Sequence, residues 1–299
     1  MQIRKAVVLT VTVLVPAALV AALWPSVPAA VHAQGDVATS TLTLPQEPAL
    51  PADASTARER LQKSPRHGEW AVIPVGAGDS LRAWVVYPER SSRAPVVLVV
   101  HEIFGLTHWI RAVADQLAAD GFIAIAPDLM TANRLPADST GEPIAEQART
   151  TIGTLDPQRY QQQLIGVAEW GMKLPAAAPR YGIVGFCWGG RASFQHAVVS
   201  PKVSAAVVYY GASPATENLA QIRAPVLGLY GGDDARVNAT VPAAEAEMKG
   251  LGKTYEVNTF EGAGHGFLRA QADRNGANLA ASRRAWPLTV AFFKKHLDS

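Results

Sequence analysis

The sequence predicts a single α/β domain in which a mostly parallel sheet is covered by helices on both faces. Strand-like and helix-like segments alternate from about residue 67 to residue 299, without an internal repeat or a second linker. The run 96–100, Val-Val-Leu-Val-Val, is apolar at every position, as expected of a strand buried on both faces of a parallel sheet. With 48% hydrophobic and 17% charged residues, a chain of 299 residues can bury a full core.

Two strands, 69–75 and 81–87, are expected to open the domain as a hairpin at the sheet edge, because the glycines of segment 76–79 suit a tight reversal. The elements that follow are expected to be strand 96–100, helix 109–119, strand 122–126, helix 157–172, strand 181–185, helix 190–199, strand 205–210, strand 226–230, helix 241–249, strand 255–260 and helix 283–296. In such a sheet, active residues collect on loops at the carboxyl ends of the strands.

Residues 1–33 have the layout of a secretory signal peptide. Arg4 and Lys5 precede a run without charge from residue 6 to residue 24, and small residues favour a cut after Ala33. An uncleaved membrane anchor is the alternative, because the apolar run approaches the roughly 20 residues that span a bilayer. Pro16 interrupts the run and favours cleavage. The protein is therefore expected to be exported, to the periplasm or the medium, without stable membrane insertion once the signal peptide is removed.

Residues 34–66 are rich in Ala, Pro, Thr and Ser and show no sustained hydrophobic period. This composition predicts a flexible arm, and residues 67–299 are then the folded domain.

Charge and cysteine content exclude several classes of function. The 27 Lys and Arg against 25 Asp and Glu leave no excess that would suggest nucleic acid as a partner, and loss of Arg4 and Lys5 with the signal peptide removes the small imbalance. The expected ligand is a small molecule. The chain has one cysteine, so it has no internal disulfide. No cluster has metal-ligand spacing, so no metal is expected.

That one cysteine lies in the segment 185–190, Gly-Phe-Cys-Trp-Gly-Gly, which follows an apolar strand and opens a helix. The spacing fits the nucleophile elbow of the α/β-hydrolase fold, with Cys187 where serine is usual. Side chains at Gly185 or Gly189 would collide with neighbouring backbone in so sharp a turn. At a helix N-terminus the dipole and the free amides are expected to favour thiolate over thiol. The alternative is a small buried core cysteine.

A nucleophile in this fold is followed along the chain by an acid and then by a histidine. His265 lies in the glycine-rich segment 262–266 between the last strand and the last helix, where the base is expected. Asp233 and Asp234 both follow strand 226–230. We favour Asp234 as the residue that orients the imidazole and stabilises its charge, because the loop after two glycines can turn its side chain toward the histidine.

The loop after strand 96–100 begins with His101 and Glu102. In this fold a backbone amide on that loop pairs with the amide after the nucleophile to hold an oxyanion, which assigns the amides of Ile103 and Trp188. For Glu102, the residues alone leave two alternatives: a solvated or salt-bridged loop residue, or a carboxylate that contacts the nucleophile.

Four motifs together resemble the dienelactone hydrolase family, also called carboxymethylenebutenolidases, from about residue 69 to the C-terminus. They are the segments 101–105 (His-Glu-Ile-Phe-Gly), 185–190 (Gly-Phe-Cys-Trp-Gly-Gly), 231–234 (Gly-Gly-Asp-Asp) and 263–269 (Ala-Gly-His-Gly-Phe-Leu-Arg). The resemblance implies a hydrolase without metal or cofactor that opens an unsaturated lactone to a linear dicarboxylate.

Carried over to this chain, the resemblance implies that Cys187 is the nucleophile, His265 the base and Asp234 the orienting acid. It implies that Glu102 regulates the charge of the thiol and accepts its proton when substrate displaces it. It also implies that Arg269 binds the substrate carboxylate, for which a guanidinium is well suited, with Phe104 as a further substrate contact.

The second substrate arginine of the family matches no motif here. Its candidates are Arg134, Arg149 and Arg159. An exported member of the family is accordingly expected to hydrolyse a small ester or lactone that need not be a dienelactone. A carboxylesterase or thioesterase of broad specificity is the alternative within the fold. A non-catalytic binding or thiol-redox protein is the alternative of another class, but that role would not require an acid and a histidine in triad order.

Overall fold

The computed structural model describes residues 47–76 and 78–298. The predicted signal peptide, residues 1–33, lies outside this range, as does the first part of the predicted arm. Over the residues described, no helix has both the length and the apolar character needed to span a bilayer.

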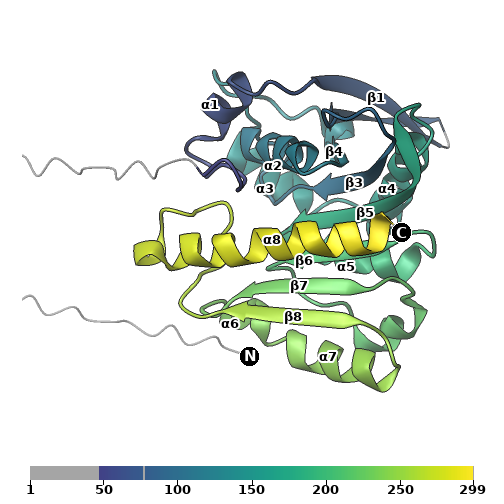
Figure 1. Ribbon diagram of the computed structural model, residues 1–299, viewed down its shortest axis with the longest axis vertical. Coiled ribbons are helices and arrows are strands. Elements are labelled where there is room, and N and C mark those ends of the chain that lie inside the picture. The colour runs from purple at the N-terminus through teal and green to yellow at the C-terminus, as the bar shows by residue number, and fades with distance from the viewer. Residues whose placement is uncertain (1–46, 77, 299) are drawn as a thin grey trace, which may run out of the picture. The chain divides into compact units, whose positions relative to one another are not determined.

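One eight-stranded sheet forms the centre of the domain, with the strand order β1-β2-β4-β3-β5-β6-β7-β8 (Figure 1). The strands are β1 Gly68–Gly76, β2 Asp79–Val86, β3 Ala94–Val100, β4 Ile123–Pro127, β5 Ala177–Phe186, β6 Ala205–Tyr209, β7 Val226–Gly231 and β8 Tyr255–Phe260. Strand β2 pairs antiparallel with both β1 and β4, and all other pairs are parallel. The mostly parallel sheet with an edge hairpin is confirmed.

Helices cover both faces of this sheet, also as predicted. The α-helices are α1 Ala57–Gln62, α2 His108–Ala119, α3 Ala145–Ile152, α4 Pro157–Gly171, α5 Trp188–Val199, α6 Ala235–Asn238, α7 Val241–Gly250 and α8 Ala277–Leu297. Helices α1, α2 and α8 pack with one set of buried side chains, and α4, α5 and α7 pack with the set on the opposite face. Helices α1, α3 and α6 were not predicted, and α8 begins six residues before the predicted residue 283.

The prediction of a flexible arm over residues 34–66 is wrong for its described part, residues 47–66. Leu50, Ala52 and Ala57 are buried in the core beneath α2, and the Trp109 indole donates a hydrogen bond to the Ala52 carbonyl (3.0 Å). Arg66 forms an ion pair with the buried Asp115 on α2. A few apolar residues with specific partners are therefore enough to order a segment whose overall composition is polar.

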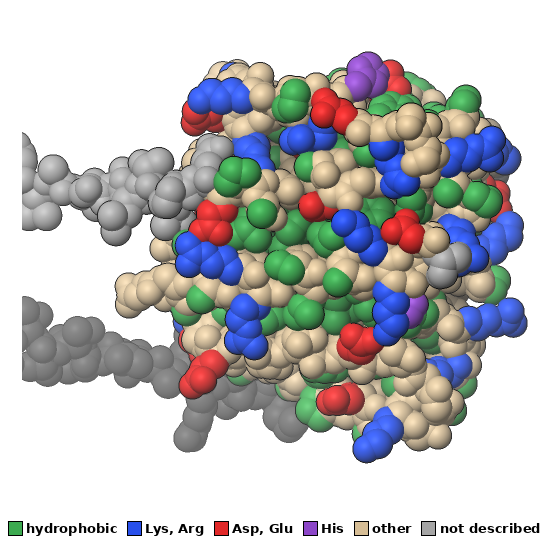
Figure 2. Space-filling view, in the orientation of Figure 1, with side chains coloured by type: hydrophobic (Ala, Val, Ile, Leu, Met, Phe, Trp, Pro, Cys, Tyr) green, Lys and Arg blue, Asp and Glu red, His purple; other side chains and the backbone are tan. Residues whose placement is uncertain are grey.

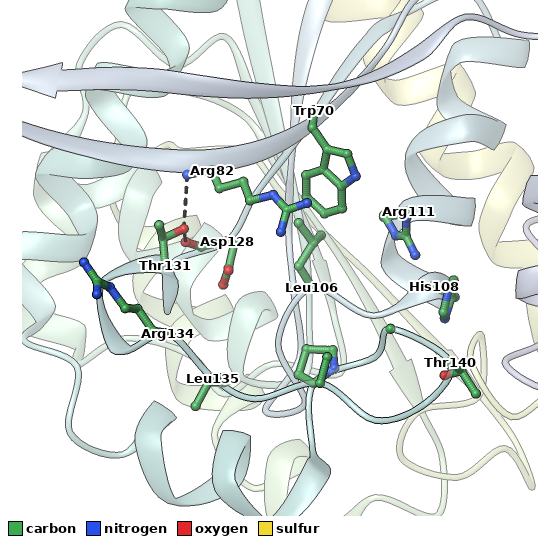
Figure 3. Close-up of a pocket in the computed structure, with 13 residues that line it drawn as sticks. Trp70, Arg82, Leu106, His108, Arg111, Asp128, Thr131, Arg134, Leu135 and Thr140 are labelled. Atoms are coloured by element: carbon green, nitrogen blue, oxygen red, sulfur yellow. Dashed lines mark hydrogen bonds between the residues drawn. The ribbon is translucent and has the colours of Figure 1, made fainter.

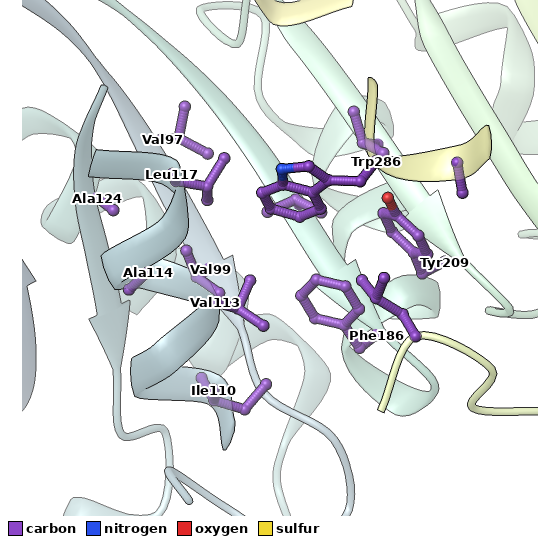
Figure 4. Close-up of a cluster of buried hydrophobic side chains, with 14 of the residues drawn as sticks. Val97, Val99, Ile110, Val113, Ala114, Leu117, Ala124, Phe186, Tyr209 and Trp286 are labelled. Carbon is purple, nitrogen blue, oxygen red and sulfur yellow. The ribbon is translucent and has the colours of Figure 1, made fainter. Parts of the chain in front are cut away.

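The core between α2 and α8 holds strand β5, which carries the elbow, in place (Figure 4). Phe186 lies directly before Cys187 and stacks with Tyr209 of β6 at 5.0 Å between ring centroids. The Tyr209 hydroxyl shares a hydrogen bond with Thr289 of α8 (2.7 Å), and the Trp286 indole donates to Asp120 (2.9 Å). Buried polar tips with partners fix this aromatic cluster in one arrangement.

Charged side chains of both signs are interspersed on the face shown in Figure 2. That face carries no continuous basic stripe of the kind that follows a nucleic-acid backbone.

Replacing Asp115 with alanine is expected to lower the free energy of unfolding by about 2–3 kcal/mol, because Arg66 would remain charged and largely buried without its partner. Chemical denaturation measures the change. The matched control is Glu59→Ala, which removes an exposed pair with Lys63 and should cost less than about 1 kcal/mol. Equal losses in the two variants would contradict the buried-pair account.

Candidate active site

Loops at the carboxyl ends of four parallel strands carry the predicted site residues. Glu102 follows β3, Cys187 follows β5, Asp234 follows β7 and His265 follows β8. Because these strands lie in one parallel array, their carboxyl ends meet at the same edge of the sheet.

Cys187 occupies the sharp turn between β5 and α5. Its backbone has φ 55° and ψ −113°, a conformation that costs energy for any residue with a Cβ atom. A Cβ atom on Gly185 would lie 1.9 Å from the Gly189 carbonyl oxygen, and one on Gly189 would lie 2.3 Å from the Val100 carbonyl oxygen. The steric reason given for both glycines is thus confirmed.

The thiol of Cys187 is neutral at rest. Burial, together with the negative charge of Glu102, raises its pKa to about 11, and the Trp188 amide and the charges of Arg236 and Arg269 only partly oppose this rise. The expectation that the helix N-terminus favours a thiolate is wrong for the resting protein, because desolvation and a nearby carboxylate outweigh the helix dipole here. Activation therefore needs a change in the surroundings of the thiol.

His265 and Asp234 form a close pair, with 2.5 Å between His265 Nδ1 and Asp234 Oδ2. Asp234 is buried, while the histidine ring is one-third exposed. Asp233 instead pairs with Arg274 at the surface (2.8 Å), so the structure brings Asp234, and not Asp233, to the histidine. Because Nδ1 is occupied by the carboxylate, Nε2 is the ring nitrogen left for proton transfer.

Glu102 is buried and forms an ion pair with Arg269. Burial raises the pKa of the Glu102 carboxyl to about 7, although Arg269 and the nearby Tyr210 hydroxyl favour the charged form. Arg269 Nε lies 2.8 Å from Glu102 Oε2. The two groups form an ion pair, but the direction of the N–H bond does not satisfy the geometry of a hydrogen bond. Of the two alternatives for Glu102, the structure supports a salt-bridged carboxylate that also acts on the thiol through its charge.

Tyr210 is a site residue that the sequence did not reveal. It follows β6 with φ 39°, its ring contacts the His265 ring at 5.1 Å between centroids, and its buried hydroxyl faces Glu102 without a hydrogen bond of acceptable geometry. Its charge environment includes Glu102, Arg269 and Cys187. Tyr210 thus links the histidine side of the site to the glutamate side. A tyrosine at the end of an apolar strand resembles any core residue, so no sequence signal marked it.

The amides assigned to an oxyanion hole are those of Ile103 and Trp188. Neither donates to a backbone carbonyl in the part of the chain that the structure describes. The Trp188 amide already faces the Cys187 sulfur, whose pKa it lowers. Both amides are therefore available to a ligand at the elbow.

Phe104 lies between two arginines. The Arg149 guanidinium is 4.9 Å and the Arg269 guanidinium 5.3 Å from the centroid of its ring. Of the three candidates for a second substrate arginine, Arg149 on α3 is thus the one whose guanidinium contacts the same Phe104 ring as that of Arg269. Arg159 pairs with Asp79 at the hairpin (3.0 Å), and Arg134 lines a different cavity.

Among the described residues, no group of three or more His, Cys, Asp and Glu side chains is arranged to hold a metal ion. The groups that the structure does assemble are a thiol, an acid–histidine pair, free backbone amides and a carboxylate–guanidinium pair. On a mostly parallel sheet with a nucleophile elbow, this set defines an α/β-hydrolase.

The family model of the dienelactone hydrolases matches residues 81–297, and the chain therefore belongs to this family. It is an enzyme of the carboxylic ester hydrolase class. It is 32% identical over 232 residues to a Salmonella typhimurium protein that is named, by inference, a carboxymethylenebutenolidase, with 73% of this chain and 84% of that protein covered.

Two further relatives support the assignment. A Bradyrhizobium protein, named by inference a 2-oxo-3-(5-oxofuran-2-ylidene)propanoate lactonase, is 29% identical over 243 residues, with 77% of this chain and 94% of that protein covered. A crystal structure from Klebsiella pneumoniae, described by inference as a dienelactone hydrolase, superposes with a TM-score of 0.66 at 28% identity and covers 76% of this chain and 98% of that one.

Glu102→Gln is expected to increase the rate at which iodoacetamide alkylates Cys187 at mildly alkaline pH by roughly three- to tenfold, because loss of the negative charge lowers the thiol pKa and thiolate is the reacting form. In the unmodified protein the rate should keep rising until the pH approaches about 11. The control is Glu169→Gln, which removes a surface carboxylate paired with Lys202. Identical pH profiles for all three proteins would refute this coupling.

Proposed function

We propose that the protein hydrolyses small, anionic lactones or esters through a thioester formed on Cys187. The observation that carries this proposal is the buried Glu102, which lies against Arg269 and raises the thiol pKa. Because Arg269 pairs with Glu102, a carboxylate of the substrate can take the place of the Glu102 carboxylate on the arginine. The names of the Salmonella and Bradyrhizobium relatives, a butenolidase and a propanoate lactonase, agree with an anionic lactone.

Glu102 activates the nucleophile in this mechanism. A substrate carboxylate that binds Arg269 displaces Glu102 from its ion pair, and a buried carboxylate without a cation becomes a stronger base. Glu102 then takes the proton from Cys187 Sγ. Since the resting pKa is about 11 for the thiol and about 7 for the carboxyl, the proton stays on sulfur until substrate arrives.

The thiolate attacks the carbonyl carbon, and the amides of Ile103 and Trp188 donate to the oxyanion. The bond from the carbonyl carbon to the ring oxygen breaks, the leaving oxygen takes the proton that Glu102 accepted from the thiol, and the acyl group remains on sulfur as a thioester. His265, oriented by Asp234, next removes a proton from water, which attacks the thioester. The carbon–sulfur bond breaks, and the sulfur takes the proton that His265 removed from water, which restores the neutral thiol.

A carboxylesterase or thioesterase of broad specificity would use the same thiol, histidine and amides. The two arginines beside Phe104 favour the anionic substrate, because such charges contribute nothing to the binding of a neutral acyl chain. A non-catalytic or thiol-redox role is disfavoured by the raised pKa of Cys187, since a neutral thiol is slow to oxidise.

Export remains part of the proposal and rests on residues 1–33 of the sequence. Mass spectrometry of the protein recovered from outside the cytoplasm should show an N-terminus at Gln34. An intact residue 1 on a membrane-bound chain would instead indicate the uncleaved anchor.

Cys187→Ala is expected to reduce hydrolysis of a dienelactone and of a short-chain aryl ester by at least about 10³-fold, because the thioester cannot form. Circular dichroism and thermal unfolding should show a folded protein, since alanine fills the same turn. Substantial turnover of either substrate by the folded variant would remove Cys187 from the mechanism.

Arg149→Gln is expected to lower kcat/KM for the anionic lactone by roughly tenfold and to leave the neutral ester within about twofold, because a charge-assisted hydrogen bond is worth about 1.5–3 kcal/mol. Arg149 does not contact Glu102, so this variant changes substrate binding without changing the thiol.

Arg159→Gln is the matched control, because its side chain pairs with Asp79 at the hairpin. Equal effects of Arg149→Gln on the anionic and neutral substrates would contradict a carboxylate subsite.

A further inference from the structure

A cavity of about 580 Å³ lies between the β1–β2 hairpin, the start of α2 and the loops that follow β3 and β4 (Figure 3). None of the candidate active-site residues lines it. Its walls include Trp70, Arg82, Leu106, Arg111, Asp128 and Arg134. A volume of this size is typical of sites for small organic molecules.

Three arginines and one acidic side chain line this cavity. Arg82 comes from β2, Arg111 from α2 and Arg134 from the loop after β4, and none of them forms an ion pair with a described residue. Asp128 is the one acidic side chain among the described residues of the wall, and its Oδ1 already accepts a hydrogen bond from the Met130 amide (3.0 Å). The cavity therefore carries an excess of positive charge.

The Arg111 guanidinium has a buried nitrogen atom, Nε, that lacks a hydrogen-bond partner among the described residues. Burial lowers the pKa of Arg111, and the charge of Arg82 lowers it further, although Glu142 partly opposes both. Glu142 is itself engaged by His108, whose amide and Nδ1 both lie 2.6 Å from Glu142 Oε1. A buried donor and charge in this state would be stabilised by an external anion.

The geometry of the walls indicates an organic ligand and not only a bare ion. The Arg82 guanidinium stacks on the Trp70 ring at 3.6 Å from its centroid, which holds it in place beside the cavity. In Figure 3, Arg134 lies on the far side of the cavity from Arg111, and Leu106 lies between them. The charges are thus on separate walls with apolar surface between, which suits a molecule with two negative groups on a hydrocarbon body.

We infer that this cavity is a second binding site, separate from the thiol site, for a small organic dianion of the dicarboxylate class. The inference stands independently of the proposed hydrolysis, because it rests on other residues.

Isothermal titration calorimetry of the full-length protein with phthalate, a planar dicarboxylate, tests this inference. We expect binding with a Kd of about 1 mM or tighter, weakened at least about tenfold by Arg111→Gln and by Arg134→Gln. Binding to this cavity should persist in Arg269→Gln, which removes the carboxylate contact proposed for the thiol site, and in Arg90→Gln, which removes a surface arginine next to Ser92. Arg134 lies on a loop, so its variant remains informative if Arg111→Gln does not fold.

Three results would overturn the inference. One is the absence of phthalate binding at about 10 mM. Another is loss of binding in Arg269→Gln with retention in Arg111→Gln and Arg134→Gln, which would place the ligand in the candidate active site. The third is binding of inorganic phosphate as tight as that of phthalate, which would show a simple anion site without selection for an organic body.

Discussion

The contact between Glu102 and Arg269 is the interaction on which the chemistry of this site depends. Burial works against the charge on Glu102, and the one nearby guanidinium offsets part of that cost. The carboxylate in turn raises the pKa of Cys187. The charges of a partly buried thiol, a buried carboxylate and an arginine that is one-third exposed are therefore coupled. In the proposed mechanism, an anion that binds the arginine changes the charge state of the other two groups.

The rest of the fold serves to hold these groups at one edge of the sheet. The core around Phe186 fixes the end of β5, and the elbow turns Cys187 out of the sheet despite the strain at its positive φ. Tyr210 bridges from His265 toward Glu102. In the proposed mechanism, activation of the nucleophile and hydrolysis of its thioester use two different bases, Glu102 and His265.

Much of the fold and the positions of the site residues could be predicted because they depend on local patterns. The buried strands, such as β3 and β6, follow apolar runs. The elbow follows from glycines at which a Cβ atom would collide with the backbone. What escaped prediction depends on tertiary partners. The sequence favoured Asp234 over Asp233 but did not reveal the partner of Asp233, which is Arg274. The raised pKa of the Cys187 thiol follows from a burial that no sequence pattern reports. Helix α3 was missed because only Ala148 and Ile152 on it are buried, yet it supplies Arg149.

The ultraviolet absorbance of the Cys187 thiolate, taken as the difference from Cys187→Ser at neutral pH, tests the central claim most directly. The account predicts no thiolate signal in the free protein, and a signal that appears when a non-hydrolysable anionic lactone analogue binds and that is lost in Arg269→Gln. A full thiolate signal in the free protein, unchanged by the analogue, would contradict control of the thiol by the glutamate–arginine pair.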